Sequence, residues 1–273
     1  MNSTISGELI IIGGAEDKSG NREILRKVAD MINKEEDTMI VSTLASDLGK
    51  EVGYDYKNLF HELGVKNVEI LDIASREECE NEKFLNMVKR ASLIFFTGGN
   101  QLKITSLVGG TLLYEEMKKL HENGGIFAGT SAGASVMSET MIVRGPDEES
   151  PKKHNLSKCP GFGFMQGVMI DQHFAQRGRI GRLLGAIAEN PSVLGIGIDE
   201  DTAIVVNKKE GYFNVIGSGA VYIIDGRYLT YSSLLEQESE VPLSLFNVKM
   251  HVLKSGNCFD LNKKQPLEEE RIR

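Results

Sequence analysis

The strongest constraint on the fold is a set of five short apolar runs separated by segments of helix length. The runs are ELIII (8–12), TMIVST (38–43), VEILDI (68–73), SLIFF (92–96) and GIFAG (125–129). Runs of this length, rich in Ile, Val and Phe, are typical of strands buried on both faces of a parallel sheet. The intervening segments predict helices near 21–34, 50–63, 80–90, 111–123 and 132–138. The first half therefore predicts an α/β fold with a mostly parallel central sheet flanked by helices.

The second half of the chain predicts additional, antiparallel strands. We expect a strand at 167–174, a helix at 177–190 that ends at Asn190-Pro191, and a last strand at 245–253. Closely spaced strands are expected at VLGIGI (193–198), TAIVV (202–206), FNVIG (213–217) and AVYIID (220–225). The tail at 263–273 is expected to be solvated. Because no Pro/Ser-rich linker divides the chain, we expect one domain over residues 1–273.

Composition and charge exclude several classes of protein. A net charge of -8 argues against a nucleic-acid binder, since no excess of Lys and Arg is present to replace condensed counterions. Three widely spaced cysteines fit neither a disulfide framework nor a zinc site, so we expect a reducing cytoplasm and no metal or other cofactor. We find no signal peptide and no apolar run of about 18 residues, so no membrane span is predicted.

The segment GTSAGAS (129–135) is a candidate nucleophile site. Its first five residues fit G-x-S-x-G, in which a strand breaks sharply into a helix and exposes the hydroxyl, here that of Ser131. The alternative is a glycine-rich connection with a serine N-cap. In an open α/β sheet, ligands bind at the carboxyl ends of the strands. The glycine turns GGAEDK (13–18) and TGGNQ (97–101) follow two other strands, so they should converge with Ser131.

An activated serine needs a base, and the base needs a group that orients it. Among five histidines, His173 alone follows a buried-looking strand inside a polar cluster, DQHFAQRGR, which favours it as the base over a structural histidine. Asp199, Glu200 and Asp201 end another apolar strand and are candidates for the third member, although acids at a strand end are usually solvated turn residues. The order serine, histidine, acid differs from that of α/β-hydrolases.

An oxyanion hole would require two backbone N–H donors near Ser131. Ala132, at the start of the predicted helix, is a candidate for one donor, and Gly98 or Gly99 for the other. The alternative for TGGN is a plain turn, and for GGAED a phosphate-binding loop. Neither segment completes a G-x-G-x-x-G or a P-loop motif, so nucleotide binding is a weak competitor.

Five motifs together resemble the cyanophycinase branch of the S51 serine peptidases, which also contains the aspartyl dipeptidases called peptidase E. They are GGAEDK, FFTGGNQ, GTSAGAS, DQHFAQRGRIGRL and GIGIDEDTA, spread over residues 7–225. The resemblance implies an α/β fold related to class I glutamine amidotransferases, a homodimer, and a Ser131–His173–Glu200 triad. It also implies substrate-binding roles for Gln101, Asp171, Gln172, Arg177, Arg179 and Arg182.

The activity implied by this resemblance is hydrolysis of cyanophycin, multi-L-arginyl-poly-L-aspartate, to β-aspartyl-arginine dipeptides. Asp171 would suit the guanidinium of each branch, and the arginines would suit its carboxylate. Because Arg179 and Arg182 are three apart, a basic helix face is the structural alternative. The expected substrate is therefore the cyanophycin polymer or a β-aspartyl peptide. Rival functions are a peptidase E-like α-aspartyl dipeptidase and a catalytically silent binding protein.

Overall fold

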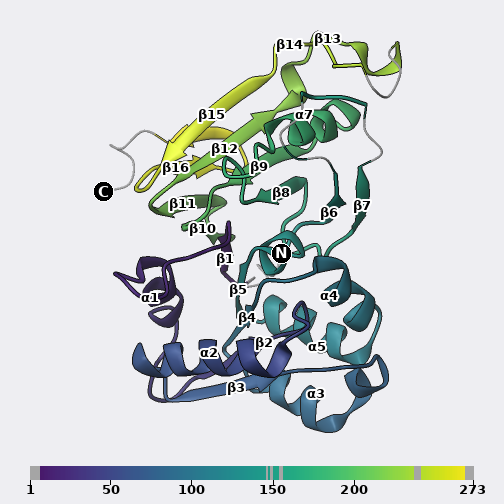
Figure 1. Ribbon diagram of the computed structural model, residues 1–273. Helices are drawn as coiled ribbons and strands as arrows, with labels where there is room; N and C mark the ends of the chain where they lie inside the picture. Colours follow the sequence, from purple (N-terminus) through teal and green to yellow (C-terminus); the bar gives the residue numbers. More distant parts are fainter. Residues whose placement is uncertain (1–6, 146, 148–149, 154–155, 237–240, 268–273) are drawn as a thin grey trace, which may run out of the picture.

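The central feature of the fold is a large mixed sheet. The computed structural model describes residues 7–145, 147, 150–153, 156–236 and 241–267. Within those residues the strands of this sheet lie in the order β17-β16-β11-β10-β1-β5-β4-β2-β3 (Figure 1). Their bounds are β1 Leu9–Ile12, β2 Thr38–Ser42, β3 Asn67–Leu71, β4 Leu93–Phe96, β5 Ile126–Thr130, β10 Thr202–Asn207, β11 Tyr212–Gly217, β16 Cys258–Asp260 and β17 Gln265–Leu267.

The first five strands form the parallel part of this sheet. β1 pairs with β5, β5 with β4, β4 with β2, and β2 with β3, in each case in parallel. Every residue of β1 and β4 is buried, as expected for strands covered on both faces. On the other side of β1, strands β10, β11, β16 and β17 add antiparallel neighbours. The protein therefore has the predicted α/β fold, a parallel core extended by antiparallel strands.

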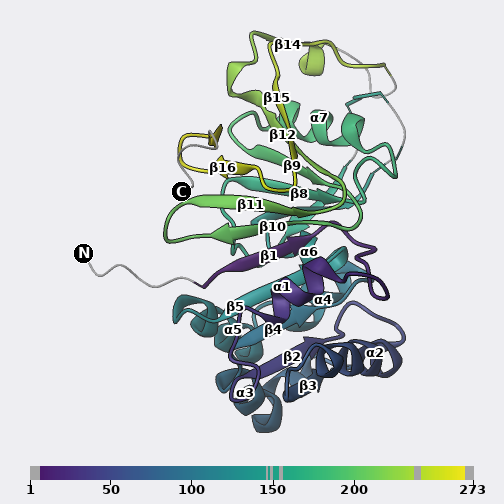
Figure 2. The same cartoon turned by 90° about the vertical axis from the view of Figure 1, so that its left-hand side faces the viewer.

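Helices cover both faces of the parallel part. The α-helices among the described residues are α1 Glu23–Ala29, α2 Gly49–Glu62, α3 Glu82–Lys89, α4 Gln101–Val108, α5 Leu112–Glu122, α6 Ala132–Ser135 and α7 Ile180–Glu189. α1 and α2 pack on one face, and α3, α4 and α5 on the other (Figure 2). The side chains of β1 alternate accordingly: Ile10 and Ile12 join the cluster under α1 and α2, whereas Leu9 and Ile11 join the other cluster.

A second, four-stranded sheet, in the order β15-β12-β9-β8, lies above the parallel part of the large sheet in Figure 1. Its strands are β8 Val168–Gln172, β9 Leu194–Ile198, β12 Ala220–Asp225 and β15 Lys249–Lys254. β8 and β9 are parallel, and α7 covers them through Leu183 and Ile187. One cluster of buried side chains runs from β1 into β8, β9 and β12. Because the core is continuous, we propose that the chain is a single domain.

Short elements complete the described chain. β6 Thr140–Arg144 pairs with β7 Ser157–Pro160, and β13 Tyr231–Ser232 pairs with β14 Leu245–Phe246. Three short 3₁₀ helices lie at Glu77–Glu80, Gly226–Tyr228 and Ser233–Leu235.

The structure departs from the sequence-based expectations at several places, and strands β6, β7 and β16 are among the elements that were not predicted. α4 was not predicted; it begins where the Asn100 side chain accepts a hydrogen bond from the Leu102 N–H at 3.0 Å. The strand expected at 245–253 is divided into β14 and β15 at Asn247, whose φ of 62° interrupts extended backbone. The tail was expected to be solvated from 263, but β17 pairs with β16 through Leu267; residues 268–273 lie outside the described chain.

Candidate active site

Loops from both sheets meet at the carboxyl ends of their parallel strands. The Ser131 N–H donates to the Ile12 carbonyl at 3.1 Å, and the His173 N–H donates to the Gly13 carbonyl at 2.8 Å. The Asp201 N–H donates to the Gly14 carbonyl at 2.9 Å. These bonds bring the GGAED turn against the serine turn, against the loop after β8 and against the loop after β9. The convergence expected from the sequence is therefore observed for this turn.

Ser131 occupies a strained turn between β5 and α6. Its backbone has φ 53° and ψ -108°, a conformation that residues other than glycine rarely adopt. Small neighbours permit the bend: a Cβ on Gly129 would lie 2.3 Å from the Gly133 carbonyl oxygen, and one on Gly133 would lie 2.4 Å from the Phe96 carbonyl oxygen. This is the geometry of a nucleophile elbow, which presents the serine hydroxyl away from the backbone.

Ser131, His173 and Glu200 form one continuous chain of hydrogen bonds. Ser131 Oγ lies 2.9 Å from His173 Nε2, and His173 Nδ1 lies 2.6 Å from Glu200 Oε1. A neutral imidazole satisfies both contacts when Nδ1–H donates to the carboxylate and Nε2 accepts from the serine. Burial lowers the pKa of His173, while the hydrogen bond to Glu200 opposes that shift. The imidazole is thus held in the neutral form that can accept a proton from Ser131.

The His173 ring is packed against the backbone of the first glycine turn. Gly14 has φ +104°, and a Cβ at this position would lie 2.3 Å from His173 Cε1. His173 itself has φ 49°, in the left-handed region. Glycine is therefore required at residue 14 both by its backbone conformation and by the ring beside it.

The structure separates the three acids that follow β9. The Asp199 carboxylate accepts the N–H groups of Ala175 and Ala220 at 2.9 and 3.1 Å. Asp201 accepts the Asp17 N–H at 2.9 Å and the Ser218 hydroxyl at 2.7 Å. These two carboxylates therefore connect neighbouring loops through hydrogen bonds. Glu200 is the acid of the three that contacts the His173 ring.

Two of the predicted oxyanion-hole residues, Ala132 and Gly98, lie beside Ser131. Ala132 is fully buried at the start of α6, and a Cβ on Gly98 would lie 3.5 Å from Ser131 Cβ. Gly99 has φ +141°, and a Cβ there would lie 2.1 Å from the Ala45 carbonyl oxygen, so its backbone packs against a different loop. Gly98 is therefore placed beside the serine, and the donor roles of all three residues stay predictions.

The two predicted substrate-binding arginines at the start of α7 form a buried cluster. Arg179 and Arg182 are 5% and 6% exposed, so they do not form a solvated basic helix face. Arg182 binds the buried Asp171 carboxylate through two nitrogens, with Nε 2.7 Å from Oδ2. Arg179 Nη1 donates to the Gln172 carbonyl at 2.7 Å and to its side-chain oxygen at 3.0 Å. Asp147 Oδ1 accepts hydrogen bonds from both guanidiniums, from Arg179 Nε at 2.9 Å and from Arg182 Nη1 at 3.1 Å.

The other predicted binding residues differ in exposure. Gln101 is buried and donates from Nε2 to the Ile142 carbonyl at 2.9 Å. Arg177 is exposed and lies near enough to His173 to lower the pKa of that imidazole. Among the described residues, no group of three or more His, Cys, Asp or Glu side chains is placed to hold a metal ion. Nor is any helix in the described ranges long and apolar enough to cross a membrane.

Two residues of this region had no assigned role in the sequence analysis. Glu16 is buried, accepts the Thr130 hydroxyl at 2.5 Å and accepts the Tyr56 hydroxyl through its other oxygen. It therefore joins the GGAED turn to the residue that precedes Ser131. The glutamate was visible in the motif, but its partner in α2 was not. Asp147 lies in a charged loop, and nothing in its local sequence indicated that it reaches α7.

The fold and this arrangement define the class of protein as a serine hydrolase: an α/β sheet presents a strained serine, hydrogen-bonded to a histidine that is oriented by a glutamate. The model of Peptidase family S51 matches residues 9–212. The chain belongs to peptidase family S51.

Curated relatives and solved structures agree with that membership. The cyanophycinase of Geminocystis herdmanii is 36% identical over 268 residues, covering 98% of both chains. The cyanophycinase of Trichormus variabilis is 37% identical over 93% of this chain and 85% of its own. A peptidase from an acI-B1 actinobacterium superposes with a TM-score of 0.66 at 22% identity, covering 94% and 98% of the two chains. A peptidase E protein from Listeria monocytogenes gives 0.54 at 16% identity, covering 78% of this chain and all of its own. These two structures are similar in fold.

Proposed function

We propose that the chain is a cyanophycinase, a serine peptidase that hydrolyses cyanophycin to β-aspartyl-arginine dipeptides. One observation carries the proposal: the Ser131–His173–Glu200 hydrogen-bonded chain occurs in a protein that matches a cyanophycinase over 98% of its length. Cyanophycin is a polyaspartate whose side-chain β-carboxyls carry arginines through isopeptide bonds, so its main chain offers aspartyl carbonyls to a nucleophile.

In the proposed mechanism Ser131 is the nucleophile and His173 moves the proton. Ser131 Oγ attacks a main-chain aspartyl carbonyl carbon while its proton passes to His173 Nε2. The tetrahedral intermediate breaks its C–N bond when His173 returns that proton to the leaving amine nitrogen. A water molecule, deprotonated by the same nitrogen, then hydrolyses the acyl-enzyme ester and restores the serine. Glu200 stabilises the imidazolium that forms in each half of the reaction.

The developing oxyanion would be stabilised by backbone N–H groups of Ala132 and of Gly98 or Gly99. The position of Gly98 beside Ser131 supports its part in this role. Backbone donors that are already fixed by the fold need no reorganisation when negative charge develops, which is why such donors lower the barrier.

Recognition of the substrate branches is assigned to the cluster around α7. Gln101, Asp171, Gln172, Arg177, Arg179 and Arg182 are proposed to contact the substrate. Because Arg182 holds Asp171 in a buried pair, a substrate carboxylate would approach the guanidiniums from the side now taken by Asp147, whose side chain is 39% exposed. Substrate binding would then exchange one carboxylate for another without leaving a buried guanidinium unpaired.

We also propose that the enzyme is a cytoplasmic homodimer. The similarity to cyanophycinases, which are usually homodimers, supports the dimer, and the sparse cysteines support a reducing compartment. Sedimentation velocity of the purified chain tests the first part, since a single species at the monomer mass would contradict it.

The function is tested by incubating the purified protein with cyanophycin, poly-aspartate and an α-aspartyl dipeptide, with Ser131→Ala as the matched control. Mass analysis of the soluble products should detect β-aspartyl-arginine from cyanophycin with the wild-type chain and none with the variant. Cleavage of the α-aspartyl dipeptide with cyanophycin untouched would instead identify a peptidase E-like enzyme. No product from any substrate, together with no labelling by a sulfonyl fluoride, would identify a silent binding protein.

A further inference from the structure

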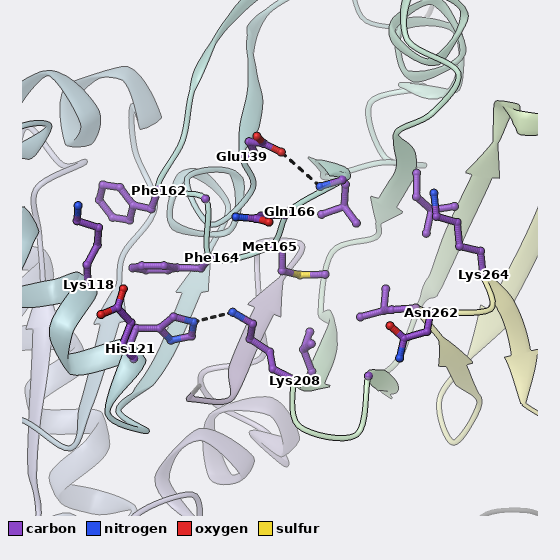
Figure 3. A pocket seen from close by; sticks show the side chains of 18 residues that line it. Lys118, His121, Glu139, Phe162, Phe164, Met165, Gln166, Lys208, Asn262 and Lys264 are labelled. Atoms are coloured by element: carbon purple, nitrogen blue, oxygen red, sulfur yellow. Dashed lines mark hydrogen bonds between the residues drawn. The ribbon is translucent and has the colours of Figure 1, made fainter. Parts of the chain in front are cut away.

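A cavity of about 790 Å³ lies at the opposite end of the sheets from Ser131. It is bounded by the end of α5, the segment before β8, the start of β9, the end of β10 and the turn after β16 (Figure 3). β5 runs between the two ends, and its five residues at about 3.3 Å each span about 16.5 Å. The cavity is therefore separate from the triad. Its volume is within the range of about 300–1,000 Å³ that is usual for small-molecule sites.

The floor of the cavity is apolar and partly aromatic. Phe162, Phe164 and Met165 line it together with aliphatic side chains from β8, β9 and β10. The rings of His121 and Phe164 have centroids 4.5 Å apart, and those of Phe162 and Phe164 are 5.5 Å apart. Figure 3 shows the Phe164 ring lying beside His121 and facing the same space as Met165. Such a surface accommodates a planar or aliphatic body of a ligand.

Lys208 contributes a partly buried cation to the wall. Its Nζ lies 3.0 Å from His121 Nε2, a bond drawn in Figure 3. Burial and the nearby Lys208 lower the pKa of His121 to about 4, so the imidazole is neutral near pH 7 and its Nε2 accepts from the lysine. Burial also lowers the pKa of Lys208. Within the described part of the chain, no carboxylate forms an ion pair with Lys208, and a partly buried cation is stabilised by an anion.

The other two lysines on the wall have protein partners. Lys118 pairs with Glu115 at 2.7 Å, and Lys264 Nζ donates to the Ser192 carbonyl at 3.0 Å. The lining also includes the carboxylates of Glu122 and Glu139, so both signs of charge occur around the cavity. Lys208 differs from the other two lysines in having its remaining donors available near the aromatic floor. An ammonium has three N–H donors, and the contact with His121 uses one of them.

We propose that this cavity binds a small organic carboxylate with an apolar body, whose carboxylate pairs with Lys208 and whose body packs on Phe164 and Phe162. The charge of Lys208 selects the anion, and the aromatic floor selects the body. This site does not depend on the proposed reaction at Ser131.

The test compares 3-phenylpropionate with its neutral amide, 3-phenylpropanamide, by titration calorimetry on the full chain. We expect saturable binding of the acid and at least tenfold weaker binding of the amide, since the two differ in charge and little in shape. Lys208→Met should weaken binding of the acid at least tenfold, whereas Lys209→Met, the exposed neighbour, should leave it unchanged. A methionine methyl spectrum should show Met165 shifting on titration and Met39, buried under α1 and α2, remaining in place.

Three results would overturn the proposal: equal binding of acid and amide, acid binding that survives Lys208→Met, or absence of saturation by 3-phenylpropionate, indole-3-acetate and octanoate up to about 10 mM. If Lys208→Met does not fold, the comparison of acid with amide on the wild-type chain, read at Met165, decides the question.

Discussion

Replacing Glu200 by Gln is the sharpest perturbation of the candidate triad. The amide is nearly the same size as the carboxylate, so packing is kept while the charge beside His173 is lost. An amide can also donate to Nδ1 and thereby favour the tautomer whose Nε2 carries the proton, which cannot accept from Ser131. We therefore expect kcat to fall with little change in the thermal unfolding midpoint.

The size of the effect follows from the geometry. His173 Nδ1 and Glu200 Oε1 are 2.6 Å apart, which places the charge centres of the imidazolium and the carboxylate about 4 Å apart. At an effective dielectric constant near 20, the attraction at that separation is about 4 kcal/mol. The Glu200 side chain is 36% exposed, so solvent screens part of it. We expect kcat to fall by roughly 10²–10³, since each 1.36 kcal/mol corresponds to a factor of ten.

The pH profile gives a second readout that a purely structural role would not move. The Glu200 hydrogen bond raises the pKa of His173 against the lowering by burial, so its removal should lower that pKa further. Because the neutral imidazole is the proposed base, the acid limb of kcat/KM should move to lower pH. The assay is cyanophycin turnover from pH 4 to 9, with Asp201→Asn as the control. A kcat for Glu200→Gln within tenfold of wild type, or an acid limb shifted upward, would refute the reasoning.

Four further substitutions test the rest of the site. Ser131→Ala should reduce kcat by roughly 10⁴–10⁶ with an unchanged unfolding midpoint, and near-normal turnover would exclude Ser131 as nucleophile. Gly14→Ala should reduce kcat at least about tenfold, because its Cβ would displace the His173 ring; a wild-type kcat would contradict that. Arg182→Lys, which loses the two-nitrogen contact with buried Asp171, should cost about 1–3 kcal/mol in denaturant-measured unfolding free energy as well as kcat/KM; an unchanged stability would contradict the buried pair. Asp147→Asn should lower KM for cyanophycin if Asp147 competes with the substrate carboxylate, and a raised KM would count against that competition.

Most of the parallel half of the fold could be predicted from the sequence because its strands are buried on both faces. An uninterrupted apolar run such as Leu9–Ile12 indicates a strand that is buried on both faces. Helix α4 was missed because it follows TGGN, a segment that suggests a turn, and because its start depends on a cap by Asn100. The division of the last strand at Asn247 could not be predicted either, because a single residue in the left-handed conformation does not change the pattern of apolar residues.

The site was predictable to the extent that its residues follow strands. Ser131, His173 and Glu200 each come one or two residues after a buried strand, and the resemblance to a family singled out Glu200 among three acids. Contacts between distant segments could not be predicted in this way. Glu16 with Tyr56, and Asp147 with Arg179, join residues whose separation in the sequence carries no information about their distance in space.

The three members of the candidate triad are carried by two different sheets. Ser131 stands at the end of β5 in the large sheet, whereas His173 and Glu200 follow β8 and β9 in the smaller one. The distance of 2.9 Å between Ser131 Oγ and His173 Nε2 therefore depends on the relative position of the two sheets. Buried apolar residues of the shared cluster, such as Ile170 and Ile196, pack between the sheets and so help to set that distance. Substitutions that add or remove a methyl group in this cluster could therefore change the distance between Ser131 and His173, and with it the reactivity of the serine, without altering a polar residue of the site.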